Sequence, residues 1–169
     1  MVNSSGSVPQ VLTVVAIYIA PGHNYFGHHG QAPGTNETVS VESADCVAGM
    51  GIHGDRFFGY KEAYKGQITF FALETHEGIS EALQVKGRSP AVYRRNVITE
   101  GIDLNTLIGA TFTVQGITFK GMAECAPCHW MDEALAPGAE SALQGRGGLR
   151  AQIVTSGILR VEKSRLPLA

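Results

Sequence analysis

Short apolar runs recur along the chain and predict a succession of strands. The run VLTVVAIYIA (11–20) is rich in β-branched residues and predicts a buried strand. In TVSVESADC (38–46) valines alternate with polar residues, which is typical of a half-buried strand. QITFFALE (67–74) predicts another strand, and THEGISEALQV (75–85) spaces its apolar residues as a helix does.

The second half of the chain continues this pattern. ATFTVQGITFKGM (110–122) has the form of a hairpin that delivers the following cysteine stretch at its far end. MDEALAPGAESALQ (131–144) predicts helix in pieces around Pro137. LRAQIVT (149–155) and ILRVEK (158–163) predict closing strands. About seven short strands with two inserted helices indicate a mainly β fold, a β-barrel with helical decorations.

Composition and charge limit the class of protein. Of 169 residues, 44% are hydrophobic and 17% charged, which favours one compact domain over residues 11–165 after a frayed terminus at 1–10. The net charge of −2 argues against a nucleic-acid surface, although all 13 cations lie from Arg56 onward. The apolar run at 11–20 is too short to span a bilayer and no cation precedes it, so we expect a cytoplasmic protein without a membrane partner.

The stretch Cys125-x-x-Cys128-His129 permits several chemistries. The pattern matches a c-type haem attachment site, but the export signal that such attachment requires is missing. A structural zinc needs four ligands, so Cys46 and a distant histidine would have to complete the set. A redox dithiol favours a thioredoxin-like unit that this pattern does not predict. Two further interpretations remain: the cysteines could be a pair of small buried residues, or one of them could display a thiolate.

Three other segments suit the binding of a small anion: HGDR (53–56), YRRNVITEG (93–101) and GRGGLR (145–150). In the last, glycine N–H groups could form an anion nest beside Arg146 and Arg150. Together the three segments favour one phosphate-sized ligand.

The middle segment predicts a strand, on which residues alternate between faces. Arg94 and Asn96 would then lie on one face and Arg95 on the other.

In this order, the segments resemble the MOSC domain, named for the C-terminal domain of molybdenum cofactor sulfurase. The resemblance covers about residues 48–155 and is to the bacterial standalone members. The matching pieces are GDRFF, QITFF, RRNVITEGIDLNTLIGATF, the Cys-x-x-Cys pair and GRGGLRAQIV.

The resemblance implies a mostly β barrel that binds the molybdenum cofactor (Mo-molybdopterin), which can be lost on purification. It implies that Cys128 supplies a thiolate to molybdenum, with Cys125 beside it, and a thiolate suits that metal. The residues expected to hold the pterin and its phosphate are Arg94, Arg95, Asn96, Thr99, Arg56, Arg146, Gly147 and Gly148.

Three functions follow from the resemblance. The first is a reductase of N-hydroxylated compounds, fed by a separate flavin or iron–sulfur electron donor because the chain has no such motif. The second is a sulfur carrier with a persulfide on Cys128, partnered by a pyridoxal-phosphate cysteine desulfurase. The third is a non-catalytic carrier of the cofactor. A homodimer is left open in each case.

Two parts of the chain depart from the family pattern. The final strand, SGILRVEK, lacks a Gly-Asp pair, so the barrel could close differently. The loop PGHNYFGHHGQAPG (21–34) is outside the signature, and His23, His28 and His29 could be a metal cluster, a lid or ordinary loop residues. His53, beside the GDR segment, is a candidate for a pocket wall.

Overall fold

The computed structural model describes residues 11–162, so the terminus expected at residues 1–10 lies outside the described residues. The strands are β1 (Thr13–Ile19), β2 (Val39–Val41), β3 (Ser43–Val47), β4 (Gly51–Ile52), β5 (Ile68–Ala72), β6 (Val97–Glu100), β7 (Thr111–Val114), β8 (Ile117–Glu124), β9 (Leu149–Ile153) and β10 (Gly157–Arg160). The helices are α1 (Leu73–Ala82), α2 (Trp130–Ala134) and α3 (Ala139–Leu143), with 3₁₀ turns η1 (Pro90–Tyr93) and η2 (Leu104–Leu107).

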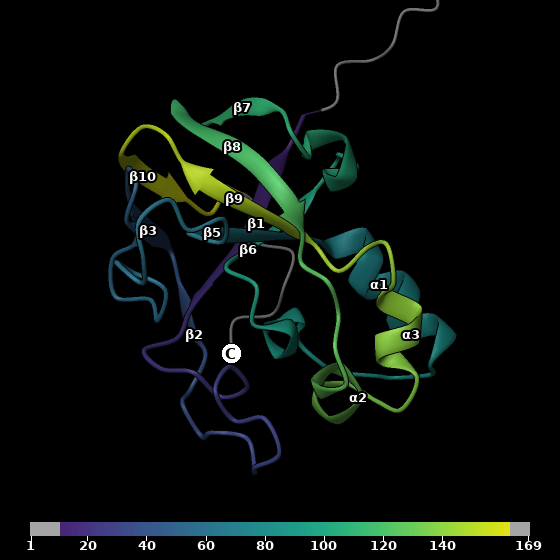
Figure 1. Cartoon of the computed structure of the whole chain (residues 1–169). Coiled ribbons are helices and arrows are strands. Elements are labelled where there is room, and N and C mark those ends of the chain that lie inside the picture. Colours follow the sequence, from purple (N-terminus) through teal and green to yellow (C-terminus); the bar gives the residue numbers. More distant parts are fainter. Residues whose placement is uncertain (1–10, 163–169) are drawn as a thin grey trace, which may run out of the picture.

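Seven strands form the main sheet, in the order β2-β1-β6-β5-β9-β8-β7 (Figure 1). All of its pairings are antiparallel except that of β5 with β6, whose connection contains α1. A parallel pair needs such a crossover, because the chain must return to the same end of the sheet. The second sheet is smaller and has the order β10-β3-β4.

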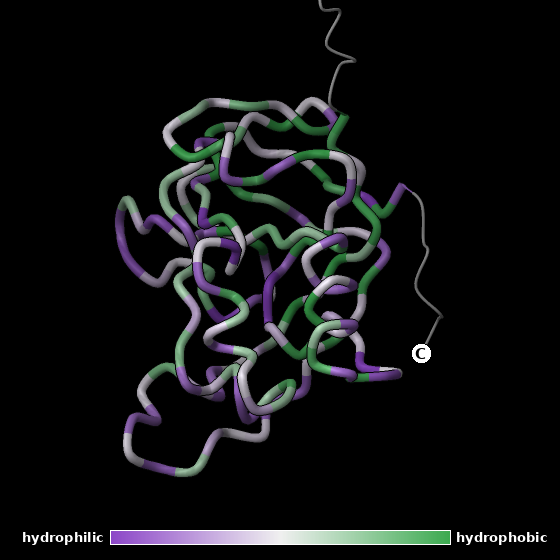
Figure 2. The backbone as a smooth tube through the Cα atoms, turned by 90° about the vertical axis from the view of Figure 1, so that its right-hand side faces the viewer, coloured by the Kyte–Doolittle hydropathy of each residue, from purple (hydrophilic) through white to green (hydrophobic). Residues whose placement is uncertain are grey.

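Two hydrophobic clusters hold these layers together. One lies between the main and the small sheet and contains Phe70 and Phe119 of the former and Cys46 of the latter. The other packs the opposite face against the helices, with Phe71 facing Ile79 of α1 and neighbouring residues of α2 and α3. The three helices therefore gather on one side of the sheet, at the right in Figure 1. In Figure 2 the loop that extends at the bottom, residues 21–38, is coloured largely purple to white, so it is mostly polar.

The prediction of a mainly β fold is confirmed, with differences in detail. The pairing runs from β2 to β7, and no pairing among residues 11–162 joins these two edges into a ring. The single strand expected at 38–46 is two strands that belong to different sheets, separated at Glu42. No helix in the described part of the chain is long and apolar enough to cross a membrane.

The strand expected over 93–101 is partly wrong. The first residues belong to η1, and Arg94 ends that turn in the left-handed conformation, with φ 55°. The strand begins only at Val97. Alternation between two faces therefore does not apply to Arg94 and Arg95, and this difference shapes the site.

Candidate functional site

A cavity of about 400 Å³, here called the Cys128 cavity, lies where five segments meet. Its walls come from the loop after β1, the turn before β5, the approach to β6, the stretch after β8, and β9. Its polar and ionisable lining residues are His23, Asn24, Tyr25, His29, Arg56, Tyr64, Thr69, Tyr93, Arg94, Arg95, Cys125, Cys128 and Arg150.

The two cysteines of the Cys-x-x-Cys stretch have different surroundings. Cys125 follows directly on β8 and is 2% exposed, and its backbone N–H donates to the Gly148 carbonyl at 2.8 Å. Cys128 is exposed and lines the cavity, and its carbonyl accepts from Met131 N–H in α2. Both thiols are free. The hairpin of β7 and β8 leads into the cysteine stretch, as the sequence predicted, and the structure adds that one thiol is buried and the other accessible.

Four arginines line the cavity, and none of the described residues that line it is Asp or Glu. Arg56, Arg94 and Arg95 were expected at a common site, and the structure brings them together with Cys128. Arg150 completes the set. A cavity lined in this way has a positive potential that attracts anions.

Arg94 makes three hydrogen bonds within the chain. Its guanidinium donates to the Gly22 and Asn36 carbonyls at 2.6 and 3.2 Å and to the Thr38 hydroxyl at 3.3 Å. Burial and the nearby charge of Arg56 lower the pKa of Arg94 to about 10, so it stays charged at neutral pH. Arg94 therefore fastens both ends of the 21–38 loop to the cavity wall.

Arg95 holds the opposite wall. It donates to the carbonyls of Gly147, Tyr93 and Cys125 at 3.0, 2.9 and 3.4 Å. Its three bonds link η1 to the loop before β9 and to the cysteine stretch. Like Arg94, it contributes charge to the cavity while its donors serve the framework.

Arg56 follows a buried carboxylate in the GDR turn. Asp55 accepts from Ala20 N–H at 3.0 Å and forms an ion pair with Arg56 at 3.3 Å. Arg56 also donates to the Arg94 carbonyl at 3.0 Å. Burial is the main cause that lowers the pKa of Arg56. The turn thus brings one cation to the cavity and anchors it to the end of β1.

Arg150 lies on β9 opposite Thr69 of β5. Its guanidinium makes no hydrogen bond to any other described residue, although it lines the cavity. The GRGGLR segment contained this signal, but its spacing gave no reason to prefer Arg150 over Arg146. The structure provides the reason, because the strand turns position 150 toward the cavity.

Asn96 and Thr99 are buried and do not line the cavity. The Asn96 side chain accepts from the Thr69 N–H and hydroxyl, both at 3.0 Å, and donates to the Tyr18 carbonyl at 3.2 Å. Thr99 donates to the Phe71 carbonyl at 3.5 Å. These residues join the strands that position Arg94 and Arg95.

The GRGG loop differs from the expected anion nest. The Gly147 N–H donates to the Glu124 carboxylate at 3.1 Å, and a Cβ at this position would overlap the Cys125 carbonyl oxygen. Glycine is therefore required by close packing against the cysteine stretch. Arg146 and Gly148 line a separate cavity and not the one that contains Cys128.

The 21–38 loop closes one side of the cavity, a contribution that the sequence left open. Tyr25 stacks on Trp130, with centroids 5.1 Å apart and planes at 24°. His29 lies 6.1 Å from the ring of His129. Both contacts reach residues directly after Cys128, so the loop packs against the beginning of α2.

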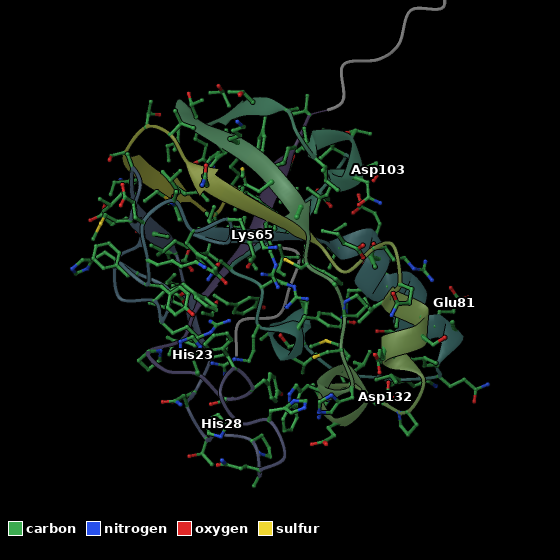
Figure 3. All side chains as sticks on the ribbon, in the orientation of Figure 1. His23, His28, Lys65, Glu81, Asp103 and Asp132 are labelled. Carbon is green, nitrogen blue, oxygen red and sulfur yellow. The ribbon has the colours of Figure 1, made fainter. Side chains whose placement is uncertain are left out.

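The three histidines of this loop have separate roles. Figure 3 shows His23 nearer the body of the protein and His28 further toward the tip. His23 packs on Phe57, with centroids 4.9 Å apart, and burial, followed by Arg56 and Arg94, lowers its pKa. His28 accepts or donates within the loop, to the Ala32 carbonyl.

No group of three or more His, Cys, Asp or Glu residues able to hold a metal ion forms within residues 11–162. His53, expected at the pocket wall, is exposed, packs on Phe58 at 5.3 Å and does not line the cavity. The imidazoles that do line it are His23 and His29.

Comparison with known proteins gives a family and a fold. Residues 28–164 match the family model of the MOSC domain. The crystal structure of the YuaD protein from Bacillus subtilis aligns with a TM-score of 0.69 and 20% identity over 89% of this chain and 91% of that chain. No curated protein matches the sequence significantly.

Two further crystal structures share the architecture. YiiM from Geobacillus stearothermophilus has a TM-score of 0.65 and 11% identity, over 91% of this chain and 73% of that chain. YiiM from Escherichia coli has a TM-score of 0.59 and 13% identity, over 86% of this chain and 66% of that chain. At these identities the likeness concerns the fold.

Proposed function

The chain belongs to the MOSC domain family, and from this premise we propose that the Cys128 cavity binds the molybdenum cofactor with Cys128 as the protein ligand to molybdenum. MOSC domains are associated with this cofactor in general. The observation that carries the proposal is an exposed thiol in a cavity lined by four arginines and no carboxylate among the described residues.

The residues present fit such a guest in size and chemistry. A volume of about 400 Å³ lies within the roughly 300–1,000 Å³ of typical small-molecule and cofactor sites. The thiolate of Cys128 is a soft ligand of the kind that suits a metal bound to sulfur. The Nδ1 of His23 is buried without a hydrogen-bond partner, and His23 belongs to the same wall. Such an atom at a cavity wall is typical of a ligand site.

The four arginines would contribute to binding in different ways. Arg150, whose guanidinium has no partner among the described residues, would form a bidentate pair with the terminal phosphate. Arg56 also lines the cavity, and Arg94 and Arg95 add positive charge while their hydrogen bonds hold the walls. Asn96 and Thr99 would support these arginines.

When bound, the cofactor supplies two-electron oxygen-atom chemistry at molybdenum. The chain itself supplies position, charge and shelter from water. The 21–38 loop, fastened by Arg94 and packed through Tyr25 on Trp130, covers the side of the cavity next to Cys128. The reaction that we propose is reduction of an N-hydroxylated compound to the amine and water, which consumes two electrons and two protons and breaks the N–O bond.

A sulfur-carrier function is the alternative that the exposure of Cys128 supports. A thiol at the surface can be reached by a cysteine desulfurase, which would transfer a sulfur atom to it as a persulfide. The arginines would then hold an anionic acceptor. A carrier that binds the cofactor without turnover would use the same residues.

The test is molybdenum analysis of protein expressed in cells with an intact molybdenum pathway. We expect wild type and Cys46→Ala, a buried thiol in the small sheet, to retain the metal, and Cys128→Ser to lose it. Cys128→Ser protein that kept both molybdenum and reductase activity would overturn the proposal. A gain of about 32 Da on the Cys128 peptide without molybdenum would favour the sulfur carrier.

A further inference from the structure

The loop that covers one side of the Cys128 cavity sends two consecutive aromatic rings to different walls. Tyr25 stacks on Trp130 of α2, with ring centroids 5.1 Å apart and planes at 24°. Phe26 lies edge-on to Tyr60 in the turn before β5, with centroids 5.7 Å apart and planes at 88°. Tyr25, Phe26 and Trp130 all line the cavity. The two rings therefore bridge the cavity from α2 to this turn.

Residues 25–33, here called the strap, form hydrogen bonds only within the loop. The His28 N–H donates to the Tyr25 carbonyl at 3.0 Å, and the Gln31 N–H donates to the His28 carbonyl at 2.9 Å. Within residues 11–162, no hydrogen bond joins the strap to a residue outside the loop. Contacts between rings therefore hold the strap against the body of the protein.

The two ends of the loop form a base that is fastened more firmly. Asn24 and Asn36 exchange two hydrogen bonds, of 2.8 and 2.9 Å, across these ends. Arg94 adds bonds to the Gly22 and Asn36 carbonyls. A Cβ at Gly22 would overlap the Asn36 side chain, whereas one at Gly27 of the strap would meet no atom within 4 Å. The base is closely packed, and the strap has open space beside it.

The rings that hold the strap precede residue 28, where the match to the family model begins. Phe26 is 55% exposed, so Tyr60 covers only part of its ring. An aromatic pair of this kind contributes modestly to stability, and lid opening in proteins occurs on the microsecond-to-second timescale. The strap thus has the features of a part that can detach while the base of the loop stays in place.

We propose that the strap is a gate over the Cys128 cavity. It opens and closes as one unit, hinged at the base of the loop. Tyr25 and Phe26 are its two latches, and both have to release for the strap to open. A ligand that enters beside Cys128 displaces the strap, which covers the ligand again when both rings return. The gate would act on any ligand of this cavity and does not depend on molybdenum.

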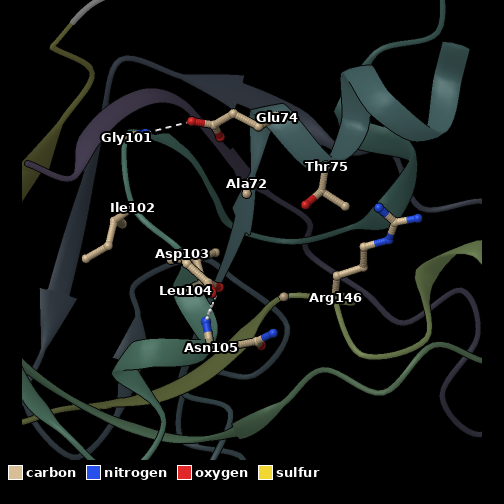
Figure 4. A pocket seen from close by; sticks show the side chains of 10 residues that line it. Ala72, Glu74, Thr75, Gly101, Ile102, Asp103, Leu104, Asn105 and Arg146 are labelled. Atoms are coloured by element: carbon tan, nitrogen blue, oxygen red, sulfur yellow. Dashed lines mark hydrogen bonds between the residues drawn. The ribbon is translucent and has the colours of Figure 1, made fainter. Parts of the chain in front are cut away.

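The second cavity, of about 420 Å³, has walls of another kind. It lies between the beginning of α1, the segment 101–105 and the loop before β9 (Figure 4). None of the described residues that line it belongs to the 21–38 loop. Opening of the strap should therefore leave this cavity unchanged, and its residues are an internal reference.

The first test follows Trp130, the single tryptophan of the chain, in the full-length protein without ligand. NMR relaxation dispersion should show one exchange process shared by the Trp130 indole N–H and the Gly27 and Gly30 amides, or a second set of these signals if exchange is slow. The Gly22 amide at the base and the Ile102 amide in the second cavity should show none. Strap signals without exchange, or a Gly22 amide that exchanges at the same rate, would contradict the proposal.

Acrylamide quenching of Trp130 fluorescence tests whether the two latches act together. Tyr25→Ala should increase the quenching constant about two- to tenfold, because one aromatic pair is lost, and Tyr25→Phe should keep the wild-type value, since its ring can still stack. Phe26→Ala should also increase the constant, although that ring packs on Tyr60 and not on Trp130. Ile158→Ala, which removes an exposed apolar side chain on β10, should leave it unchanged.

The Phe26→Ala result separates a gate from a local contact. An unchanged quenching constant in this variant would overturn the proposal, because the Tyr25 stack would then stand by itself. An equal increase in Ile158→Ala would also overturn it, since the protein would be loosening as a whole. If Tyr25→Ala does not fold, wild-type NMR and Phe26→Ala decide. Neither test contains the cofactor, so the outcome is separate from that of the molybdenum analysis.

Discussion

The four arginines around Cys128 differ in how far the chain itself already satisfies their donors. Arg94 and Arg95 each donate to three oxygens of the framework, and Arg56 to two. Arg150 donates to none among the described residues. The N–H groups of the Arg150 guanidinium are therefore the donors that a ligand can use without breaking hydrogen bonds of the fold.

We therefore expect Arg150→Gln to weaken cofactor binding about 10- to 100-fold, because a hydrogen bond to a charged group is worth about 1.5–3 kcal/mol. Arg146→Gln is the matched control, since that residue lines the other cavity and should leave cofactor retention unchanged. The dissociation constant measured by rebinding of released cofactor checks both. Equal losses in the two variants would contradict this assignment.

A substitution at Gly147 tests how tightly the GRGG loop packs against the cysteine stretch. Gly147→Ala should destabilise the protein by about 1–3 kcal/mol, because the added Cβ overlaps the Cys125 carbonyl and forces the backbone apart. Gly78→Ala is the control: that glycine is in α1 with open space around it, and alanine there should stabilise by about 0.5–1 kcal/mol. Urea unfolding measures the stability of both variants. An unchanged free energy of unfolding in Gly147→Ala would show that the backbone can move to accommodate the added Cβ.

Several residues of the site could be predicted from the sequence. Where the prediction failed, the failure has a physical cause. The hairpin pattern placed the Cys125–Cys128 stretch, but the spacing alone left a buried pair and a displayed thiolate both open. The arginine-containing segments and the resemblance to the MOSC domain favoured the displayed thiolate. The prediction placed Arg146 and not Arg150 among the cofactor-binding residues, whereas the structure has Arg150 in the lining of the Cys128 cavity and Arg146 in that of the other one. The glycines around Arg146 allow the chain to turn in several directions, so the sequence does not fix where that side chain points. The common orientation of Arg94 and Arg95 depends on a positive φ at Arg94, which strand alternation does not foresee.

At the scale of elements, α1 and η1 are joined through a buried histidine. The His76 Nε2 lies 3.0 Å from the Arg88 carbonyl, so it carries the proton and donates. The Nδ1 then accepts from the Tyr93 hydroxyl at 2.9 Å. Burial lowers the pKa of His76 and raises that of Tyr93 to about 12, so both are neutral in the folded protein at pH 7.

This pair predicts acid sensitivity. Above the unfolded value of about 6.5 both states hold a neutral His76, and as the pH falls below it the unfolded state binds the proton first. The free energy of unfolding should therefore decrease as the pH falls below about 6.5. His76→Gln should reduce this slope. Tyr93→Phe should lose about 1 kcal/mol at neutral pH and keep the slope. Identical slopes in wild type and His76→Gln would contradict the assignment.

The elements themselves were largely foreseeable. The β7–β8 hairpin, the first strand and the helical pieces around Pro137 follow from periodicity and turn residues. The division of segment 38–46 into two strands could not be predicted. The chain passes from one sheet to the other at Glu42, and this depends on which strands each half pairs with. Strand pairing depends on contacts between residues far apart in the sequence, and a local alternating pattern does not predict which strands pair.

At the scale of the whole molecule, the mainly β class was predictable and the strand order came only with the structure. The described fold is one pair of sheets with helices on one side. Under the proposed function the electrons come from a separate flavin or iron–sulfur protein.

Protein loaded with cofactor should therefore not reduce an N-hydroxylated substrate with NADH alone. Adding a competent flavin or iron–sulfur donor should start turnover, followed as amine formed over time. Cys128→Ser with the same donor is the control and should stay inactive. Steady turnover with NADH and no second protein would contradict this expectation.

The central claim concerns one sulfur atom and one metal, and X-ray absorption at the molybdenum edge tests it most directly. Loaded wild-type protein should show one more sulfur neighbour at molybdenum than the free cofactor does. Cys128→Ser loses the metal during purification, so it is reconstituted with an excess of free cofactor, and it should then show that neighbour replaced by an oxygen. An identical sulfur count in wild type and Cys128→Ser would mean that this thiol is not the ligand.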